Sequence, residues 1–213
     1  MEKRNWKHIV TLKQRMVLCL AAFFAAFALQ LALNGYQARA VQQVQDDQMG
    51  NFNAISRFQG GVESSISILE AYRWENGETE EMLEKLQAAC STSNAWLWRI
   101  RSNMDGLQNV SDEQWVLYGA VETTYGSYNT LLEELESYLS SGQEAKASQL
   151  YYNKVSVCGG YLSQYTMQLL KASILDAQTT YTEISELGER IALMQIVVVA
   201  LCVALGCASG LMV

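Results

Sequence analysis

The sequence predicts an all-α protein: an antiparallel four-helix bundle in up-down-up-down order, whose first and last helices run on into two membrane-spanning helices. Three observations predict this fold. The 213 residues contain no proline, although average usage would give about ten, which favours long unbroken helices. Apolar residues recur at steps of three and four through most of the chain. Two further stretches are apolar on every side.

The two apolar stretches are the predicted membrane spans. The first, residues 16–35, contains MVLCLAAFFAAFALQLAL, and the second, residues 191–213, contains IALMQIVVVALCVALGCASGLMV. A bilayer core of about 30 Å requires roughly 20 apolar residues in a helix, and both stretches meet that requirement. Each has one glutamine, Gln30 or Gln195, as its main polar residue.

The flanking charges predict the orientation. The basic residues ahead of the first run are Lys3, Arg4, Lys7, Lys13 and Arg15. Such clusters keep their end of a span in the cytoplasm, so we expect a cytoplasmic tail at 1–15, an extracytoplasmic domain at 36–190 and a two-pass location in the cell membrane. An alternative is a cleaved secretory signal ending at 38–40, ARA, although its apolar run exceeds the usual length of about 7–15 residues.

Turn signals divide the outer segment into four helices at about 36–75, 78–108, 112–140 and 143–190. The turns are ENGETEE at 75–81, NVSDEQ at 109–114 and SSGQEA at 140–145. Within the second turn, Ser111 is the expected N-cap, with Gln114 as its capping-box partner. Short connections of this kind make neighbouring helices antiparallel.

Each helix has a seam of core-facing positions at heptad-like spacing. The first seam is Val41, Val44, Gln48, Asn51, Ile55, Phe58, Val62, Ser65, Leu69 and Tyr72. The third helix carries a double row that includes Tyr118, Val121, Tyr125, Tyr128, Leu132 and Leu135. In the last helix the row is expected to change phase after Leu169, to Leu170, Ile174, Ala177, Tyr181 and Ile184.

A basic tail, a span, an acidic helical domain and a second span together resemble the input half of bacterial transmembrane sensor histidine kinases and chemoreceptors. The resemblance implies a parallel homodimer that binds a small molecule or a binding protein and relays this by a small movement of the last helix. In such families a HAMP linker and an output domain follow the second span, so the chain is expected to be a fragment. The alternative is a complete two-span membrane scaffold or adhesin without an output domain.

Composition excludes several functions. The net charge is −7, and an acidic domain repels nucleic-acid phosphates. His8 is the single histidine, and no nucleophile motif, metal-ligand spacing or phosphate loop occurs. We therefore expect no enzyme activity, cofactor or metal in this chain, and a histidine kinase domain only in the full-length protein that the resemblance implies.

The first candidate binding site is a layer of small and polar residues at one height of the bundle. Counted from the distal ends, Gly60, Gly61, residues 89–94, Gly126, Gly159 and Gly160 share a level. Glycine costs a helix interior about 1 kcal/mol relative to alanine, so the layer requires a reason. One interpretation is a cavity for a small polar ligand; its expected lining is Ser91, Ser93, Asn94, Tyr125 and Tyr128. The other is close backbone packing, or a flexible layer in which helices slide.

Cys90 and Cys158 lie in the same layer. Their helices are diagonal in an up-down-up-down bundle, so the Cα atoms should lie beyond the roughly 7 Å that a disulfide allows. We expect two buried free thiols.

The second candidate site is a dimer face. Trp98, Arg99 and Arg101 point away from the seam of the second helix, and Arg57 lies on the first. Arginines and an exposed tryptophan can hold a carboxylate or phosphate ligand. The alternative is that Trp98 is buried against a neighbouring helix or dimer partner while the arginines pair with local acids.

Overall fold

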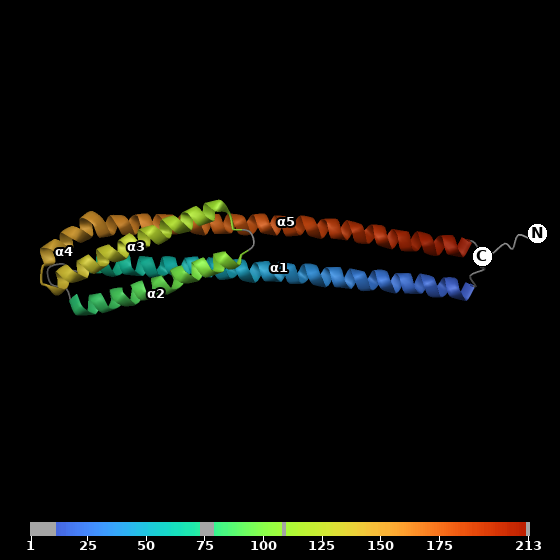
Figure 1. Ribbon diagram of the computed structural model, residues 1–213, viewed down its shortest axis with the longest axis horizontal. Helices are drawn as coiled ribbons and strands as arrows, with labels where there is room; N and C mark the ends of the chain where they lie inside the picture. The colour runs from blue at the N-terminus through green and yellow to red at the C-terminus, as the bar shows by residue number, and fades with distance from the viewer. Residues whose placement is uncertain (1–11, 73–78, 108–109, 212–213) are drawn as a thin grey trace, which may run out of the picture. The chain divides into compact units, whose positions relative to one another are not determined.

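The computed structural model describes residues 12–72, 79–107 and 110–211. In chain order its elements are α1 (Leu12–Ala71), α2 (Thr79–Gly106), α3 (Asp112–Ser140), α4 (Glu144–Leu150), the π-helix η1 (Tyr151–Val155) and α5 (Ser156–Leu211) (Figure 1). Within these described ranges every element is helical. The all-α prediction is therefore confirmed.

The chain forms two compact units. Val44–Thr180 make one, called here the bundle unit, and Met1–Gln43 with Tyr181–Val213 make the other, the terminal unit. Helices α1 and α5 contribute residues to both. The expected domain limits at 36 and 190 stay a prediction.

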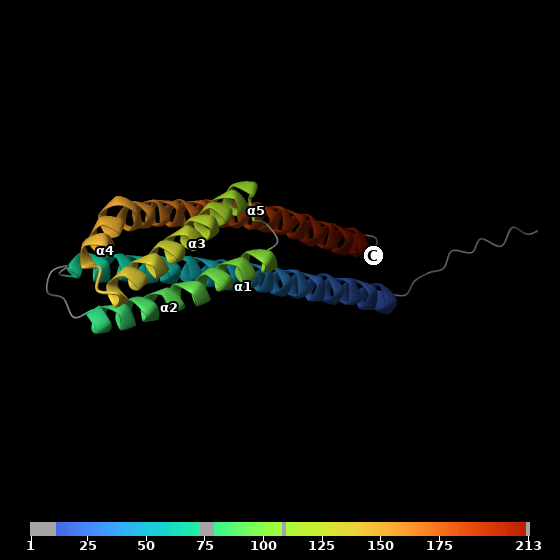
Figure 2. The same cartoon turned by 60° about the vertical axis from the view of Figure 1, so that its left-hand side comes forward.

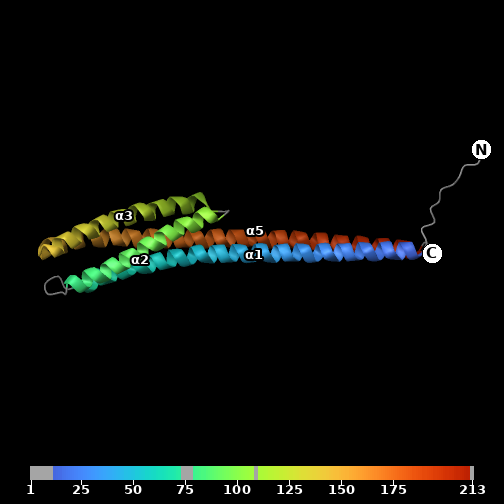
Figure 3. The same cartoon turned by 60° about the horizontal axis from the view of Figure 1, so that its bottom comes forward.

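In the bundle unit, α2 lies beside α1, and α3 lies beside α5 (Figures 2 and 3). A hydrogen bond from Asn51 Nδ2 to Ser173 Oγ, 3.3 Å long, joins α1 to α5. A second, 2.8 Å between the Tyr72 and Thr79 hydroxyls, joins the end of α1 to the start of α2. The helical bundle that the sequence predicts is thus present.

The seams form the core of the bundle unit as the heptad spacing predicts. The fully buried large side chains include Ile55, Phe58, Val62, Leu69, Ile100, Met104, Val121, Tyr128, Leu135, Leu162 and Leu169. Polar seam positions of α1 and α2 are buried with them: Gln48, Asn51, Ser65 and Ser93. The spacing of three and four therefore identified the inward face even where the residue is polar.

The N-terminus of α3 is capped as predicted, although only in part. Ser111 Oγ accepts a hydrogen bond of 3.2 Å from the Gln114 backbone N–H, and Asp176 Oδ2 of α5 accepts one of 3.0 Å from the Ser111 N–H. The reciprocal bond of a capping box is not formed, because the Gln114 side chain is buried and its Oε1 has no partner among the described residues. Gln114 is thus a core residue rather than the second half of a capping box.

The predicted change of phase in the last helix is wrong at Ile174 and Tyr181, while Leu170, Ala177 and Ile184 are half-buried. Thr166, Leu169, Ser173 and Thr180 are buried, whereas Ile174 and Tyr181 are 40% and 39% exposed. The seam continues in its original phase with polar residues, because Ser173 faces the polar Asn51 of α1. The helix expected at 143–190 also contains the π-helical turn Tyr151–Val155, which the sequence did not indicate.

A buried polar layer therefore crosses the bundle unit near Asn51. Three side-chain carbonyl oxygens there and in the first turn of α3 are buried without a hydrogen-bond partner in the described chain: Gln48 Oε1, Asn51 Oδ1 and Gln114 Oε1. An unsatisfied buried acceptor costs about 1–3 kcal/mol. This end of the core is consequently less stable than its apolar part.

The terminal unit has no buried side chain among those described. Within it, Gln195 Nε2 of α5 donates a hydrogen bond of 3.1 Å to Asn34 Oδ1 of α1. Its exposed apolar side chains include Phe23, Phe24, Phe27, Leu193 and Ile196. The core of the described chain accordingly lies in the bundle unit.

The membrane prediction is corrected by the structure. A span requires a helix with about 20 consecutive apolar residues, and none of the helices, over the residues that the structure describes, combines that length with that apolarity. This overturns the membrane and transmembrane assignments at 16–35 and 191–213, and with them the two-pass cell-membrane location. Residues 1–11 of the predicted cytoplasmic tail lie outside the described residues, as do several side chains within both runs.

The polar layer yields a stability prediction. Replacing Asn51 with leucine removes a buried unsatisfied acceptor and adds apolar contact. It also removes the 3.3 Å bond to Ser173, whose hydroxyl can donate to a carbonyl of its own helix instead, so we expect Asn51→Leu to raise the free energy of unfolding by about 1–2 kcal/mol. Urea denaturation followed by circular dichroism measures the change.

Gln45→Leu is the matched control, because Gln45 is exposed on the same helix and its replacement should change stability by less than about 0.5 kcal/mol. A loss of stability in Asn51→Leu would contradict the prediction, since it would mean that the Asn51–Ser173 hydrogen bond stabilises the fold by more than the unsatisfied acceptor costs.

Candidate functional site: a cleft between α2 and α3

A cleft of about 290 Å³ lies between α2 and α3 in the bundle unit. Its apolar lining consists of Leu83, Leu86 and Leu132, and its uncharged polar lining of Gln87, Ser91, Asn94 and Asn129. The ionisable residues of the lining are Cys90, Tyr125, Glu133 and Glu136. This combination of an apolar base with several polar groups is typical of small-ligand sites.

Helical periodicity places these side chains. On α2 the lining residues recur at steps of three and four from Leu83 to Asn94, and on α3 they do so from Tyr125 to Glu136, so each set lies on one face of its helix. Leu86, Tyr125 and Leu132 are buried, whereas Gln87, Asn94 and Glu133 are exposed. The cleft therefore has an apolar floor and a polar rim.

Tyr125 closes the floor of the cleft. Its hydroxyl donates a hydrogen bond of 2.8 Å to the Cys90 carbonyl oxygen, which ties α3 to α2. Its ring packs edge-on against Phe58 of α1, with the ring centroids 5.3 Å apart. Burial raises the pKa of Tyr125 to about 12, so the hydroxyl stays protonated and remains a donor at neutral pH.

Cys90 and Cys158 are both free thiols, as predicted, but each is half-buried rather than buried. Burial, with a smaller contribution from the Glu136 carboxylate, raises the pKa of Cys90 to about 11. Burial also raises the pKa of Cys158, whose Sγ donates to the Thr124 carbonyl oxygen at 3.7 Å. Both thiols are therefore protonated and weakly nucleophilic at neutral pH.

The structure brings three of the five predicted layer residues together. Ser91, Asn94 and Tyr125 line the cleft. Ser93 instead faces α1 and donates to the Ala89 carbonyl oxygen at 2.9 Å, and the Tyr128 hydroxyl lies 3.1 Å from Ser65 Oγ of α1. Ser93 and Tyr128 are thus core residues, and a ligand-binding role for the other three stays a prediction.

Two acidic residues of the lining, Glu133 and Glu136, were not predicted from the sequence, because they lie beyond the glycine level toward the distal end of α3. The signal that could have found them is their spacing from Tyr125: Asn129, Glu133 and Glu136 continue the same face of the helix at steps of four, four and three. The level of the glycines therefore coincides only with the part of the cleft that lies farther from the distal end of α3.

The glycines of the layer serve two different purposes. At Gly61 a Cβ atom would collide with Ser93 Oγ, and at Gly159 it would lie 3.2 Å from both the Ile66 side chain and the Tyr128 ring. These two glycines permit close helix packing. A Cβ atom added at Gly60, Gly126 or Gly160 would have no neighbouring atom within 4 Å, so close packing does not explain these three.

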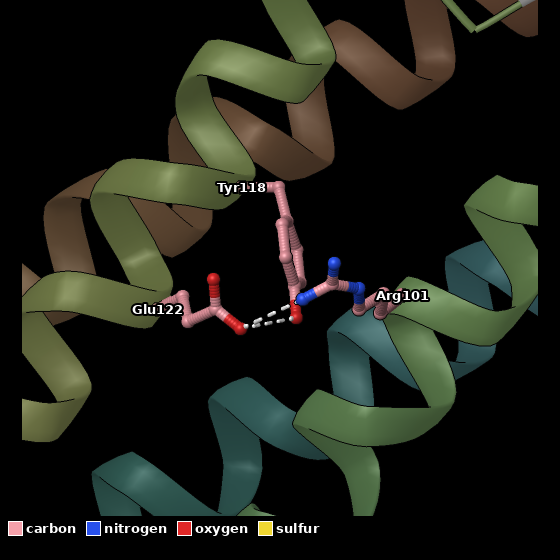
Figure 4. Close-up of polar contacts among 3 residues, drawn as sticks. All are labelled: Arg101, Tyr118 and Glu122. Atoms are coloured by element: carbon pink, nitrogen blue, oxygen red, sulfur yellow. Dashed lines mark hydrogen bonds and ion pairs between the residues drawn. The ribbon is translucent and has the colours of Figure 1, made fainter.

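The structure gives Arg57 and Arg101 of the second candidate site different partners, and a ligand-binding role for its four residues stays a prediction. Arg101 Nη1 pairs with Glu122 Oε1 of α3 at 3.5 Å, and the Tyr118 hydroxyl donates to the same oxygen at 3.2 Å (Figure 4). Arg57 stacks on the Trp96 ring, 5.5 Å from its centroid, and donates from Nε to Asn53 Oδ1. Trp98 is 69% exposed, and Arg99 is exposed beside it.

No metal site is evident in the described ranges, which contain no grouping of three or more histidine, cysteine, aspartate or glutamate side chains in suitable positions. His8 lies outside those ranges.

Comparison of the chain with protein-family models, with curated proteins and with solved structures gives no match. The resemblance to sensor kinases and chemoreceptors accordingly stays a hypothesis.

The electrostatics of the cleft can be tested through Cys90. In a background with the other four cysteines replaced by serine, Glu136→Gln removes a negative charge near the thiol and lowers its pKa. The thiolate fraction then rises, so we expect iodoacetamide at pH 8.5 to alkylate Cys90 about two- to tenfold faster.

Glu134→Gln is the control, because it makes the same change of charge on the same helical turn, at a carboxylate that accepts from the Tyr138 hydroxyl and does not line the cleft. Equal rates in all three proteins would show that Glu136 does not act on the thiol.

The packing role of Gly159 can be tested against its neighbour. A leucine at Gly159 has to displace Ile66 and Tyr128, so we expect Gly159→Leu to lower the free energy of unfolding by about 1–3 kcal/mol. Gly160→Leu places the same side chain in open space and should be neutral or slightly stabilising. Thermal unfolding of both variants measures the difference, and equal effects would refute the close approach of α5 at Gly159.

Proposed function

We propose that the bundle unit is the ligand-binding input module of a signalling receptor of the sensor-kinase or chemoreceptor type. A small polar ligand binds in the α2–α3 cleft, and α5 relays the binding event. The observation that supports this is the spacing of two tyrosines on α3: Tyr125 lines the cleft, and Tyr128, one turn further on, contacts both α1 and α5.

The relay begins at the wall of the cleft. A ligand that contacts Tyr125 or Asn129 can displace α3, because both residues belong to that helix. The Tyr128 hydroxyl is 3.1 Å from Ser65 of α1, and the Tyr128 ring lies against Gly159 of α5. A shift of α3 therefore acts directly on the two helices that continue beyond the bundle unit.

The start of the last helix gives it freedom to respond. The π-helical turn Tyr151–Val155 joins α4 to α5, and α3 contacts both α4 and this turn. Such π-helical turns are frequently found at functional sites. A displacement of about 1–2 Å, the usual scale of helix shifts in switching proteins, can be absorbed there.

The up-down-up-down helix order and the parallel homodimer implied by the resemblance belong to the same proposal. In such a dimer two copies would respond together, and the ligand would be a small molecule or would be delivered by a binding protein. The competing function is a helical scaffold that binds partners without relaying a signal.

The relay is tested with spin labels on the full chain. In a background with serine in place of the native cysteines, labels are attached at Ser56→Cys of α1 and Gln168→Cys of α5, two exposed positions. Amino acids, amines, sugars and carboxylic acids are first screened by thermal shift for a compound that stabilises the chain. We expect that compound to change the distance between the two labels by about 1 Å or more.

Two controls accompany this measurement. A label pair within α1, at Ser56→Cys and Glu63→Cys, should not change, and Asn94→Leu should abolish the thermal shift because Asn94 lines the cleft. Binding in the cleft with no change of the α1–α5 distance would favour the scaffold. A screen without any binder would overturn the proposal.

A further inference from the structure

We propose that the α2–α3 cleft selects a primary ammonium ion, with the ammonium group at Glu133 and Glu136 and a short hydrocarbon chain on the leucines of the floor. The inference deepens the proposed function and rests on it, because it assigns a ligand class to the same cleft. Four features of the cleft support it: its charge, its enclosure, its hydrogen-bonding groups and its size.

The charge of the cleft is uncompensated. Glu133 and Glu136 lie three residues apart on α3, so the two carboxylates are neighbours on one helix face, and among the described residues neither has an ion pair or a hydrogen bond. The lining contains no lysine or arginine. Two cations of α2 are engaged elsewhere, Lys85 with Glu81 and Arg101 with Glu122. A cation from outside the chain is therefore the complementary ligand.

The buried floor of the cleft strengthens this charge on its inner side, next to the half-buried Glu136, whereas Glu133 is exposed at the rim. Leu86, Tyr125 and Leu132 are buried in its floor, and a low local dielectric increases the attraction between opposite charges. Cys90, on the inner wall, lies within reach of this negative charge. The pKa of its thiol is raised mainly by burial and secondly by the Glu136 carboxylate. An anion would meet the same two carboxylates and be repelled.

The hydrogen-bonding groups favour a primary ammonium over a quaternary one. An ammonium group has three N–H donors, and the rim offers carboxylate oxygens together with the side-chain carbonyls of Gln87, Asn94 and Asn129. Quaternary ammonium ions are bound by cages of several aromatic rings, whereas Tyr125 is the single aromatic residue of this lining.

The volume limits the ligand to a few heavy atoms. About 290 Å³ is at the lower end of the range for ligand pockets, which is roughly 300–1,000 Å³. Leu83, Leu86 and Leu132 supply an apolar surface beside the carboxylates. A short alkyl chain on an ammonium group fits both the size and the division of the lining into apolar floor and acidic rim.

The test uses three probes with one hydrocarbon skeleton and different charge: 3-methylbutylammonium, 3-methyl-1-butanol and 3-methylbutanoate. Isothermal titration calorimetry on the full chain measures Kd for each. We expect the ammonium ion to bind at least tenfold more tightly than the alcohol and the carboxylate. The double variant Glu133→Gln/Glu136→Gln should raise Kd for the ammonium ion at least tenfold and leave Kd for the alcohol unchanged.

Glu134→Gln is the control. Glu134 lies between Glu133 and Glu136 in the sequence but does not line the cleft, so its replacement should change Kd for the ammonium ion by less than twofold. Alcohol or carboxylate binding as tightly as the ammonium ion, an unaffected double variant, or no binding of any probe would each overturn the ammonium assignment. The proposed function is tested separately. It fails if a compound that binds in the cleft leaves the distance between the labels on α1 and α5 unchanged.

Discussion

The structure depends on the need to satisfy tyrosine hydroxyls inside a helical core. Tyrosine rings fill much of the bundle unit, and each brings a hydroxyl that has to be hydrogen-bonded when it is buried. Tyr125 reaches the Cys90 carbonyl of α2, Tyr128 reaches Ser65 of α1, and Tyr72 reaches Thr79 of α2. These bonds join different helices, so they fix the relative height of α1, α2 and α3 as well as their separation. The cleft exists at this level because Tyr125 holds α2 and α3 together along its floor.

The sequence predicted the core well because spacing, rather than apolarity alone, marks the inward face of a helix. Gln48 and Asn51 were placed on the seam of α1 and are buried. The same logic failed in α5, where the apolar Ile174 and Tyr181 suggested a new phase while Ser173 and Thr180 kept the old one. Where an apolar row and a polar row compete for the inward face, as in α5, the partner helix decides between them, and Asn51 is that partner for Ser173. The π-helical turn leaves no comparable signal in the residues of 151–155.

The site was predicted only in part, because a cleft depends on which side of a helix each residue occupies. Ser91 and Ser93 are two positions apart, about 200° around the helix, so one lines the cleft and the other faces Gly61 of α1. The glycines indicated only the height of the layer along the bundle. Height alone does not say which of the two serines faces the cleft. The pairing of Arg101 with Glu122 likewise depends on the angle at which α2 and α3 meet, and the sequence does not specify that angle.

The bundle unit combines a tight level with a loose one, and the relay proposed above depends on this contrast. Around Tyr128 the helices approach closely enough that only glycine fits at position 159 without displacing its neighbours. Around Asn51 and in the first turn of α3, three buried acceptors lack partners within the described chain, and each costs about 1–3 kcal/mol. A rearrangement of these side chains therefore breaks few hydrogen bonds. Packed cores respond to small forces by switching between discrete arrangements rather than by bending continuously. A ligand acting through Tyr125 at the tight level would therefore produce its largest displacement at the loose level, where α1 and α5 leave the bundle unit.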